Sequence, residues 1–394
     1  MGGNWQKVSR NRILRDDSGR IGANMDEIRC AIIGIGTMGK RYASMLNTHA
    51  IDGLVLTAVC GRSEASRTWA RENLSGNVLF CGSEDELYMH QDAFDAVLVV
   101  TPHKQHPAMT IRALLAGKHV MCDKPAGVTA ADAAAMAECA EREGKVYGLM
   151  CHQRTYAGHR KLKQLLDDGE LGEITRANLV NCRFFRTKFY HQSGSWRSSW
   201  SGEGGGALIN QGYHLLDLWQ WLFGLPDALY ADIPFGKYND FHVDDEATLV
   251  MDYPGKMTGT FILSTGEGNR TERLEIVGTR GYVMLEEETL TLKRFSVDTR
   301  EYADTAQVTD RRELGETEER FCFDGNERAY ETMLQNFAAA VRGKAKLIAP
   351  GRDGVNTLML INAAYLSAWE GRKLQLPVDM NQYRTALQFR EENE

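Results

Sequence analysis

Three closely spaced glycines, in the run Gly34-Ile35-Gly36-Thr37-Met38-Gly39, constrain the fold of this chain more than any other feature. They follow the apolar run Arg29-Cys30-Ala31-Ile32-Ile33 and precede a helix expected to begin at Gly39. Glycine permits a tight strand-to-helix turn, and it lets backbone N–H groups approach a pyrophosphate at the helix N-terminus. The context therefore predicts a dinucleotide-binding βα unit rather than a merely structural turn.

Short apolar runs alternate with helical periodicity from Ile28 to about Met150. Strands that are apolar on both faces belong to a parallel sheet covered by helices on both sides. This half is therefore predicted to be α/β, a doubly wound Rossmann sheet. Further strands are expected over 54–59, 96–100 and 118–122, and helices over 107–116 and 130–143.

After Gly172 the apolar residues alternate with polar ones, which favours a large open, mostly antiparallel sheet in a second α+β domain. We expect a polar leader over 1–27, a Rossmann domain over 28–150, and a substrate-binding and oligomerisation domain with C-terminal helices over 151–394. An open sheet face needs solvent or a partner subunit, so a homo-oligomer packed through it is expected. Strands are predicted over 175–180, 247–253, 257–262, 273–277 and 281–286, and helices within 327–371.

Composition excludes several classes of protein. A chain of 394 residues, 43% hydrophobic and 25% charged, is typical of a globular protein with two domains. A net charge of −7 argues against a nucleic-acid partner. No apolar run has the length of a signal peptide or a membrane span, so we expect a cytoplasmic protein with no membrane partner. The eight scattered cysteines indicate reduced core thiols, and residues 1–24 are interpreted as a leader or an alternative start.

The second apolar run ends in Val59-Cys60-Gly61-Arg62-Ser63, without the acidic residue that usually holds the adenosine ribose of NAD. Gly61 leaves room for a 2′-phosphate, and Arg62 and Ser63 offer it charge, which favours NADP. Equally, Arg62 can stack on the adenine of NAD. The cofactor is therefore predicted to be NAD or NADP.

The next apolar run ends in Thr101-Pro102, at the sheet edge where ligands bind, so both residues are expected to touch the cofactor. His106 follows at a helix start. It is a candidate cofactor contact, although a capping or core role is more ordinary for a lone histidine.

Asp123-Lys124-Pro125 follows another strand at the same edge. Asp123 and Lys124 are expected to face the cofactor there, because the proline that follows is rigid. The lysine ammonium can donate to a substrate hydroxyl and stabilise its alkoxide.

A second glycine turn, Gly204-Gly205-Gly206, leads into a helix that carries Asn210, His214 and Asp217. Asn210 and His214 are four residues apart and so share one helix face. An imidazole beside an amide can move a proton to or from a substrate hydroxyl.

Taken in order, the first glycine run, Thr101-Pro102, Asp123-Lys124-Pro125 and the second glycine turn with His214 and Asp217 resemble the Gfo/Idh/MocA family, that of glucose-fructose oxidoreductase and inositol dehydrogenase. The resemblance covers about Ile28 to Pro377. It implies an NAD(P)-dependent sugar or polyol oxidoreductase with a Rossmann domain and an α/β domain built on an open sheet.

The resemblance places the family's lysine at Lys124 and its helix histidine, the general base, at His214. The aspartate that is frequent four residues earlier is Asn210 here, a departure. An amide can orient an imidazole only by hydrogen bonding, so Asn210 is predicted to be a substrate ligand and an orienting partner. Lys124, His214 and Asn210 are thus the candidate catalytic residues.

Aromatic and guanidinium side chains interleave in the segments around Arg154 and Arg186-Thr187-Lys188-Phe189-Tyr190. Such a mixture suits a sugar, because its C–H faces stack and its hydroxyls bond. Arg154, Arg186 and Tyr190 are candidate substrate contacts, although an ordinary surface strand pair and tryptophan core packing are the alternatives. By resemblance, Gln153, Trp196 and Arg197 are cofactor contacts.

The run His242-Val243-Asp244-Asp245-Glu246 is predicted to be solvated charge or the approach to a hairpin rather than a metal site. No metal is expected.

Together these features predict hydride transfer between a nicotinamide and a ring hydroxyl, at C3, of a sugar or glycoside. One alternative is an NAD-dependent glycosidase that passes through a 3-keto intermediate, with Tyr190 or His191 as base for the C2 proton. Others are an inositol or polyol dehydrogenase and an idle NAD(P)- or sugar-binding protein. Retention of both Lys124 and His214 argues against the idle protein.

Overall fold

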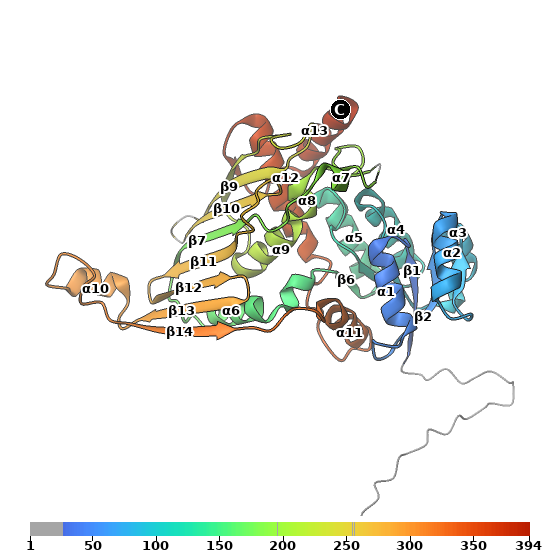
Figure 1. Cartoon of the computed structure of the whole chain (residues 1–394), viewed down its shortest axis with the longest axis horizontal. Coiled ribbons are helices and arrows are strands. Elements are labelled where there is room, and N and C mark those ends of the chain that lie inside the picture. The colour runs from blue at the N-terminus through green and yellow to red at the C-terminus, as the bar shows by residue number, and fades with distance from the viewer. Residues whose placement is uncertain (1–26, 195, 254, 256) are drawn as a thin grey trace, which may run out of the picture.

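The computed structural model describes residues 27–194, 196–253, 255 and 257–394. The chain forms two sheets, and most helices pack against one of them or between them, whereas α10 (Thr299–Thr305) projects away from both (Figure 1). Apart from Glu27, the predicted leader lies outside the described residues. Among those residues, no helix combines the length and the apolarity that a bilayer crossing requires. The cytoplasmic location stays a prediction.

The first sheet is parallel and confirms the predicted Rossmann fold. Its strand order is β3-β2-β1-β4-β5-β6, so the chain reverses direction across the sheet between β1 and β4. Ligands bind beside such a switch point, at the carboxyl ends of the strands. The strands are β1 (Ile28–Ile33), β2 (Leu54–Cys60), β3 (Leu79–Cys81), β4 (Ala96–Val99), β5 (His119–Cys122) and β6 (Tyr147–Leu149).

Five helices alternate with these strands. The helix predicted from Gly39 begins two residues earlier, because Gly36 is its N-cap and Thr37 already has helical geometry. Boundaries shift by a residue or two elsewhere, as is usual for helix ends. The helices are α1 (Thr37–Asn47), α2 (Glu64–Asn73), α3 (Glu84–Met89), α4 (His106–Leu115) and α5 (Ala130–Arg142).

The second sheet is open and mostly antiparallel, as predicted; among its pairs only β7 and β10 run parallel. In β9, Ala247, Leu249 and Met251 are buried and the residues between them are partly exposed. This alternation produces one core face and one open face. The homo-oligomer through that sheet stays a prediction. The strands are β7 (Ile174–Asn181), β8 (Ala228–Asp232), β9 (Glu246–Asp252), β10 (Thr258–Ser264), β11 (Glu272–Gly278), β12 (Gly281–Glu286), β13 (Thr289–Phe295), β14 (Glu316–Cys322) and β15 (Leu374–Gln375).

Sequence patterning missed several elements of this half. Strand β14 alternates weakly, because nearly all of its residues are exposed at the sheet edge. Strands β8, β13 and β15 also went unpredicted, as did four helices: α6 (Ala157–Asp167), the one-turn α7 (Lys188–His191), α10 (Thr299–Thr305) and α13 (Met380–Glu392).

The helix predicted to carry Asn210, His214 and Asp217 is divided into α8 (Ala207–Asn210) and α9 (Gly212–Phe223), with Gln211 between them. Gln211 itself has helical backbone angles, φ −77° and ψ −44°. The interruption coincides with the Asn210 carbonyl, which accepts a hydrogen bond from the Lys124 ammonium. The prediction that Asn210 and His214 share one helix face therefore still holds approximately.

The predicted C-terminal helices are α11 (Ala329–Val341) and α12 (Asp353–Glu370). Helix α12 packs against α5 of the Rossmann half and against α9 and β8 of the other half, which joins the two halves (Figure 1). Its middle is apolar nearly all round, which is typical of a fully enclosed helix.

A buried ion pair fastens the same junction. Arg154, on the short 3-10 helix His152–Thr155, donates through Nε and Nη2 to both oxygens of Asp217 at 2.8 and 2.7 Å. Its Nη1 donates to Asp353 at 2.6 Å, at the start of α12. The Arg154 and Asp217 side chains are each 1% exposed. Arg154 therefore links the end of the Rossmann half to α9 and to α12.

Asp217→Asn should destabilise the chain by on the order of 3 kcal/mol, because it leaves the buried guanidinium with one carboxylate instead of two. Urea unfolding followed by circular dichroism measures this directly.

Glu141→Gln is the matched control, since it breaks the exposed pair with Arg352. Its cost should stay below about 1 kcal/mol. Equal costs for the two variants would contradict the importance given to the buried pair.

Candidate functional site

The first glycine turn has the geometry that a dinucleotide requires. Gly34 has φ +103°, and a Cβ there would meet the Val100 carbonyl oxygen at 2.5 Å. A Cβ on Gly39 would collide with the Gly34 carbonyl oxygen. A Cβ on Gly36, by contrast, would meet no described atom within 4 Å. Gly34 and Gly39 are thus required by close packing of the backbone, and Gly36 faces open space.

That space lies at the N-terminus of α1. No side chain in the described residues caps this helix end, and its first turn has no acidic residue. Its free N–H groups and positive dipole therefore fit the pyrophosphate of a dinucleotide. Backbone groups of Gly36, Thr37 and Met38 would hold it.

The end of β2 offers an exposed guanidinium. Arg62 is exposed and close enough to Glu84 for their charges to interact, whereas Gly61 packs against Ser66. Ser63 is the N-cap of α2, and its Oγ accepts from the Ser66 N–H at 3.1 Å. Arg62 therefore remains the better candidate for the adenosine end of the cofactor.

His106 is not a cofactor contact. It is completely buried, and its ring nitrogens lie 2.7 Å from the Pro125 carbonyl oxygen and 2.6 Å from that of Thr101. Both nitrogens are therefore engaged with backbone. The ring ties the end of β4 to the loop after β5, so the core role is the right one.

Lys124 joins the two halves of the chain. Its Nζ donates to the Asn210 side-chain Oδ1 and to the Asn210 backbone oxygen, each at 2.9 Å. Burial is the main cause that lowers the pKa of Lys124, partly offset by the negative charges of Asp123 and Glu203. Burial also raises the pKa of Asp123, which lies behind the lysine and accepts from its backbone N–H. The ammonium is thus held at the domain interface with one N–H left over.

Asp244 fixes the glycine turn that positions Asn210. Its carboxylate accepts from the Gly206 N–H at 2.9 Å, the Leu208 N–H at 2.6 Å and the Tyr365 hydroxyl at 2.6 Å. Asp244 and Asp245 are 1% and 0% exposed. Solvated charge was the wrong alternative for these two residues, because each carboxylate accepts from backbone N–H groups. The hairpin alternative is confirmed, since the run leads into β9, which pairs antiparallel with β8.

His214 lies on α9, close enough to Lys124 for the charge of the lysine to act on it. Burial, the charge of Lys124 and the neighbouring His152 hold the pKa of His214 well below its usual range. Its Nδ1 is buried and has no hydrogen-bond partner among the described residues. The His152 ring meets it edge-on, with centroids 4.7 Å apart. A neutral imidazole with a free nitrogen is suited to accept a proton.

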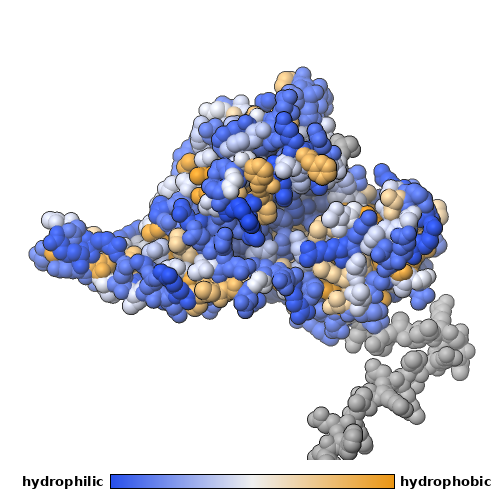
Figure 2. All heavy atoms as spheres, viewed as in Figure 1, coloured by the Kyte–Doolittle hydropathy of each residue, from blue (hydrophilic) through white to orange (hydrophobic). Residues whose placement is uncertain are grey.

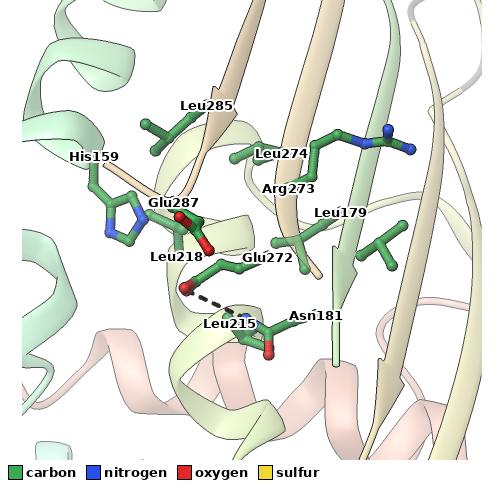
Figure 3. Close-up of a pocket in the computed structure, with 11 residues that line it drawn as sticks. His159, Leu179, Asn181, Leu215, Leu218, Glu272, Arg273, Leu274, Leu285 and Glu287 are labelled. Carbon is green, nitrogen blue, oxygen red and sulfur yellow. Dashed lines mark hydrogen bonds between the residues drawn. The ribbon is translucent and has the colours of Figure 1, made fainter. Parts of the chain in front are cut away.

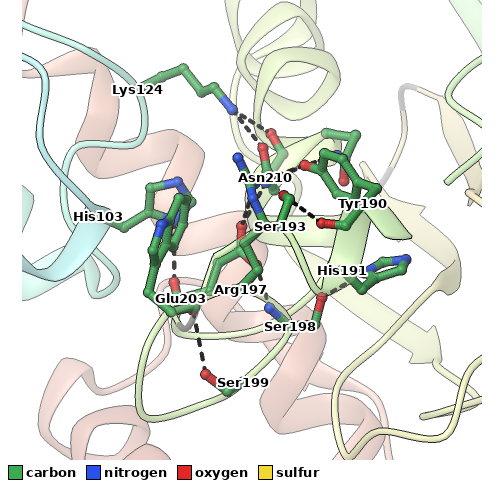
Figure 4. A network of polar contacts seen from close by, with 12 residues as sticks. His103, Lys124, Tyr190, His191, Ser193, Arg197, Ser198, Ser199, Glu203 and Asn210 are labelled. Atoms are coloured by element: carbon green, nitrogen blue, oxygen red, sulfur yellow. Dashed lines mark hydrogen bonds and ion pairs between the residues drawn. The ribbon is translucent and has the colours of Figure 1, made fainter. Parts of the chain in front are cut away.

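The segment before the glycine turn forms a polar network (Figure 4). The Tyr190 hydroxyl accepts from Arg197 Nη1 at 2.9 Å and from the Asn210 and Gln211 side-chain amides at 3.2 Å. The Arg186 guanidinium lies over the Tyr190 ring, 4.4 Å from its centre. Two of the predicted substrate contacts, Arg186 and Tyr190, therefore lie together, and Tyr190 also contacts Asn210.

Trp196 lies beside Arg197, whose guanidinium is 4.6 Å from the indole centre, and its ring meets His103 edge-on. The preceding residue, Ser195, lies outside the described residues. Trp200 and Trp219 are 2% and 0% exposed, so they belong to the core.

Arg154 is not a substrate contact. Its side chain is 1% exposed, and its donors are engaged by Asp217, Asp353 and the Ile348 carbonyl oxygen. The neighbouring Gln153 is also buried, but its Oε1 has no partner among the described residues. Gln153 therefore remains a candidate cofactor contact.

Sequence reasoning missed Glu203, His103 and His152. Glu203 immediately precedes the glycine turn and is 2% exposed, and its carboxylate accepts from Asn210. A carboxylate next to a ligand-binding turn was a signal available in the sequence. The placement of His103 and His152 depended on long-range packing and had no such signal.

The polar groups of the site lie where the two halves meet, and Figure 2 shows this face hollowed there and mostly hydrophilic. A separate small cavity lies under the second sheet (Figure 3). Neither Lys124 nor His214 lines it. Its lining residues are His159, Leu179, Val180, Asn181, Leu215, Leu218, Glu272, Arg273, Leu274, Leu285 and Glu287.

Two family models match the chain. One, described as oxidoreductase family, NAD-binding Rossmann fold, matches residues 28–150. The other, described as GFO/IDH/MocA C-terminal domain, matches residues 159–284.

Several characterised proteins are similar to the chain. The D-glucoside 3-dehydrogenase of Escherichia coli K12 is 32% identical over 200 residues, which is 50% of this chain and 55% of that protein. The scyllo-inositol 2-dehydrogenase (NADP(+)) of Bacillus subtilis is 25% identical, over 89% and 97% of the two chains. The WlbA dehydrogenase of Chromobacterium violaceum, crystallised with NADH and UDP-GlcNAcA, aligns with a TM-score of 0.76 at 25% identity, over 91% and 98%.

Gly36→Ala should weaken dinucleotide binding about tenfold or more, because its methyl group enters the space that fits the pyrophosphate. Since that methyl meets no described atom within 4 Å, the melting temperature should hardly change. Titration of NADH fluorescence measures the affinity.

Gly39→Ala is the matched control, because its methyl collides with the Gly34 backbone instead. It should lower the melting temperature. Undiminished NADH affinity in Gly36→Ala would show that the dinucleotide does not use this turn.

Proposed function

Because the chain belongs to the Gfo/Idh/MocA family of NAD(P)-binding oxidoreductases, which act on sugar-like substrates, we propose that it transfers a hydride to or from C3 of a sugar or glycoside ring. The position of the hydroxyl is the proposal; the oxidoreductase class and the NAD(P)-binding Rossmann domain follow from the family. When bound, the nicotinamide supplies the hydride acceptor or donor.

The observation that carries the proposal is the meeting of Lys124 and His214 at the junction of the two halves. Lys124 comes from the carboxyl edge of the Rossmann sheet, where the nicotinamide end of a dinucleotide reaches. His214 comes from α9, and the charge of Lys124 acts directly on it. A hydroxyl bound between them faces one donor and one acceptor.

His214 is the proposed base. Because its pKa lies well below the usual range, the ring is neutral at neutral pH and can take the hydroxyl proton. In the reducing direction the same ring, once protonated, returns the proton to the new alkoxide. The proton and the hydride therefore leave the carbinol by separate routes.

Lys124 is the proposed electrostatic partner. Two of its N–H groups are spent on Asn210, so the third can donate to the substrate oxygen. A buried ammonium stabilises a developing alkoxide more than a solvated one does, because little water screens it. Asn210 would orient the lysine and contact the sugar, with Tyr190, Arg186 and Arg197 around it.

The similarity to a glucoside 3-dehydrogenase supports the choice of C3. That alignment covers half of this chain, so the rest of the substrate pocket is outside it. The inositol dehydrogenase that aligns over 89% of the chain supports the alternative of a cyclic polyol.

His214→Gln should lower the rate of hydride transfer about 10²- to 10⁴-fold, because the hydroxyl loses its base. Lys124→Met should lower it about 10²- to 10³-fold, because the alkoxide loses its donor. Stopped-flow NADH absorbance with a methyl glucoside measures both.

His90→Gln and Lys344→Ala are matched controls with exposed side chains, and both should retain the wild-type rate. Near-normal rates in both site variants would refute the assigned roles.

Methyl glucoside deuterated at C3 should react two- to several-fold more slowly, and the deuterium should appear in the NADH. The same label at C2 should do neither. Mass spectrometry of the nucleotide distinguishes the two positions.

The same assay tests the alternatives. Release of methanol without net NADH formation would indicate the glycosidase. Turnover of inositols alone would indicate the polyol dehydrogenase. Nucleotide or sugar binding without turnover across the panel would indicate an idle binding protein.

A further inference from the structure

Glu203 is a buried carboxylate in the middle of the polar network (Figure 4). Its Oε1 accepts from Asn210 Nδ2 at 2.5 Å, and its Oε2 accepts from the Ser198 N–H at 2.7 Å. Arg197 Nη1 lies 4.0 Å from Oε1. Glu203 is 2% exposed, and Asn210 connects it to Lys124. A carboxylate buried in this way is costly unless its hydrogen bonds are satisfied, so its role lies within the network.

Glu203 decides which way the Asn210 amide points. A side-chain amide has one accepting and one donating end, and either can face a given neighbour. Lys124 can only donate, so it requires the Asn210 oxygen. An ionised Glu203 can only accept, so it requires the Asn210 nitrogen. With both charges present, only one orientation of the amide satisfies both.

The negative charge of Glu203 is partly balanced by cationic side chains from other parts of the chain. Arg197 and Lys124 are the cations that face it, and His103 lies 3.2 Å from its backbone oxygen through Nδ1. Tyr190 is linked to it through both Asn210 and Arg197, which donate to the Tyr190 hydroxyl. Burial raises the pKa of Glu203 to about 6, although the Ser198 N–H, the two cations and Asn210 oppose that rise. The carboxyl group therefore changes charge close to neutral pH.

Protonation of Glu203 would break this arrangement. A protonated oxygen facing Asn210 would oppose one donor with another, so the amide would gain by turning over. The turned amide would then present its nitrogen to the Lys124 ammonium, again donor against donor. The loss of negative charge would also remove one of the interactions that raise the pKa of Lys124.

We propose that Glu203 is a positioning residue of the site: its carboxylate fixes the Asn210 amide so that Lys124 is held, oriented and charged, for the substrate oxygen. The inference rests on the proposed function for its effect on turnover. Its effect on Lys124 itself is independent of any substrate.

The first test is Glu203→Gln, compared with wild type over pH 5 to 9. Wild-type kcat should fall below about pH 6 as Glu203 becomes protonated, whereas the variant should lack that transition and have kcat lowered about tenfold at pH 7.5. KM for NADH and the melting temperature should stay close to wild type. A variant whose transition remains in place would overturn the proposal.

Exchanging the two side chains sharpens the test. Asn210→Asp alone puts two carboxyl groups in contact, so one must be protonated and the rate should fall. Glu203→Gln combined with Asn210→Asp returns one charge and one amide to the pair, with the carboxylate now facing Lys124. The double variant should be several-fold faster than Asn210→Asp; a double variant slower than both single ones would count against a shared role.

A measurement without substrate separates this proposal from the proposed function. In protein with ¹³C-labelled lysine, the Lys124 resonance, assigned with Lys124→Met, should titrate at lower pH in Glu203→Gln than in wild type. Identical titrations would overturn the role of Glu203, even where the variant is slow because it folds poorly. A shifted titration in a protein that reduces no nucleotide would refute the proposed function and leave the positioning role intact.

Discussion

The buried pair of Arg154 and Asp217 is the interaction on which the rest of the arrangement depends. It joins the short helix at the end of the Rossmann half to α9, and Asp353 extends it to α12. Two charges removed from water are costly unless their hydrogen bonds are satisfied, and here both oxygens of Asp217 and all three guanidinium nitrogens are engaged. The pair therefore links the helix that carries His214 to the end of the Rossmann half.

The site is a product of docking rather than of either half alone. Lys124 ends a strand of one half, and Asn210 lies on α8 of the other; they meet only because Asp244 holds the glycine turn before α8. The carboxylate of Asp244 occupies the place that an N-cap side chain would take. It accepts hydrogen bonds from free N–H groups at the start of α8, and its negative charge interacts favourably with that end of the helix. A local structural feature thereby brings Asn210 within hydrogen-bond distance of the Lys124 ammonium.

Desolvation gives the site its chemistry. Burial pushes Lys124, His214 and Glu203 each toward the neutral form, and their hydrogen bonds and mutual charges decide how far each one moves. His214 is a neutral hydrogen-bond acceptor, whereas Lys124 has the negative charges of Asp123 and Glu203 near it. Groups of different type that titrate apart from one another can divide the donor and acceptor roles of one proton transfer.

Local pattern in the sequence determined the Rossmann half, because a buried parallel strand and a glycine turn each leave a short-range signature, as at Ile28–Ile33 and Gly34. It also made Lys124 and His214 candidate site residues, since both stand next to such signatures, and their roles stay a prediction. It wrongly placed Arg154 among the substrate contacts and left His106 open between a cofactor contact and a core role, because whether a polar side chain faces a ligand or a buried partner depends on residues 63 and 19 positions away. Only the tertiary structure could bring Glu203, Asn210 and Lys124 into one network, because Lys124 lies in the Rossmann half, 86 residues before Asn210, and the two side chains meet only when the two halves pack together.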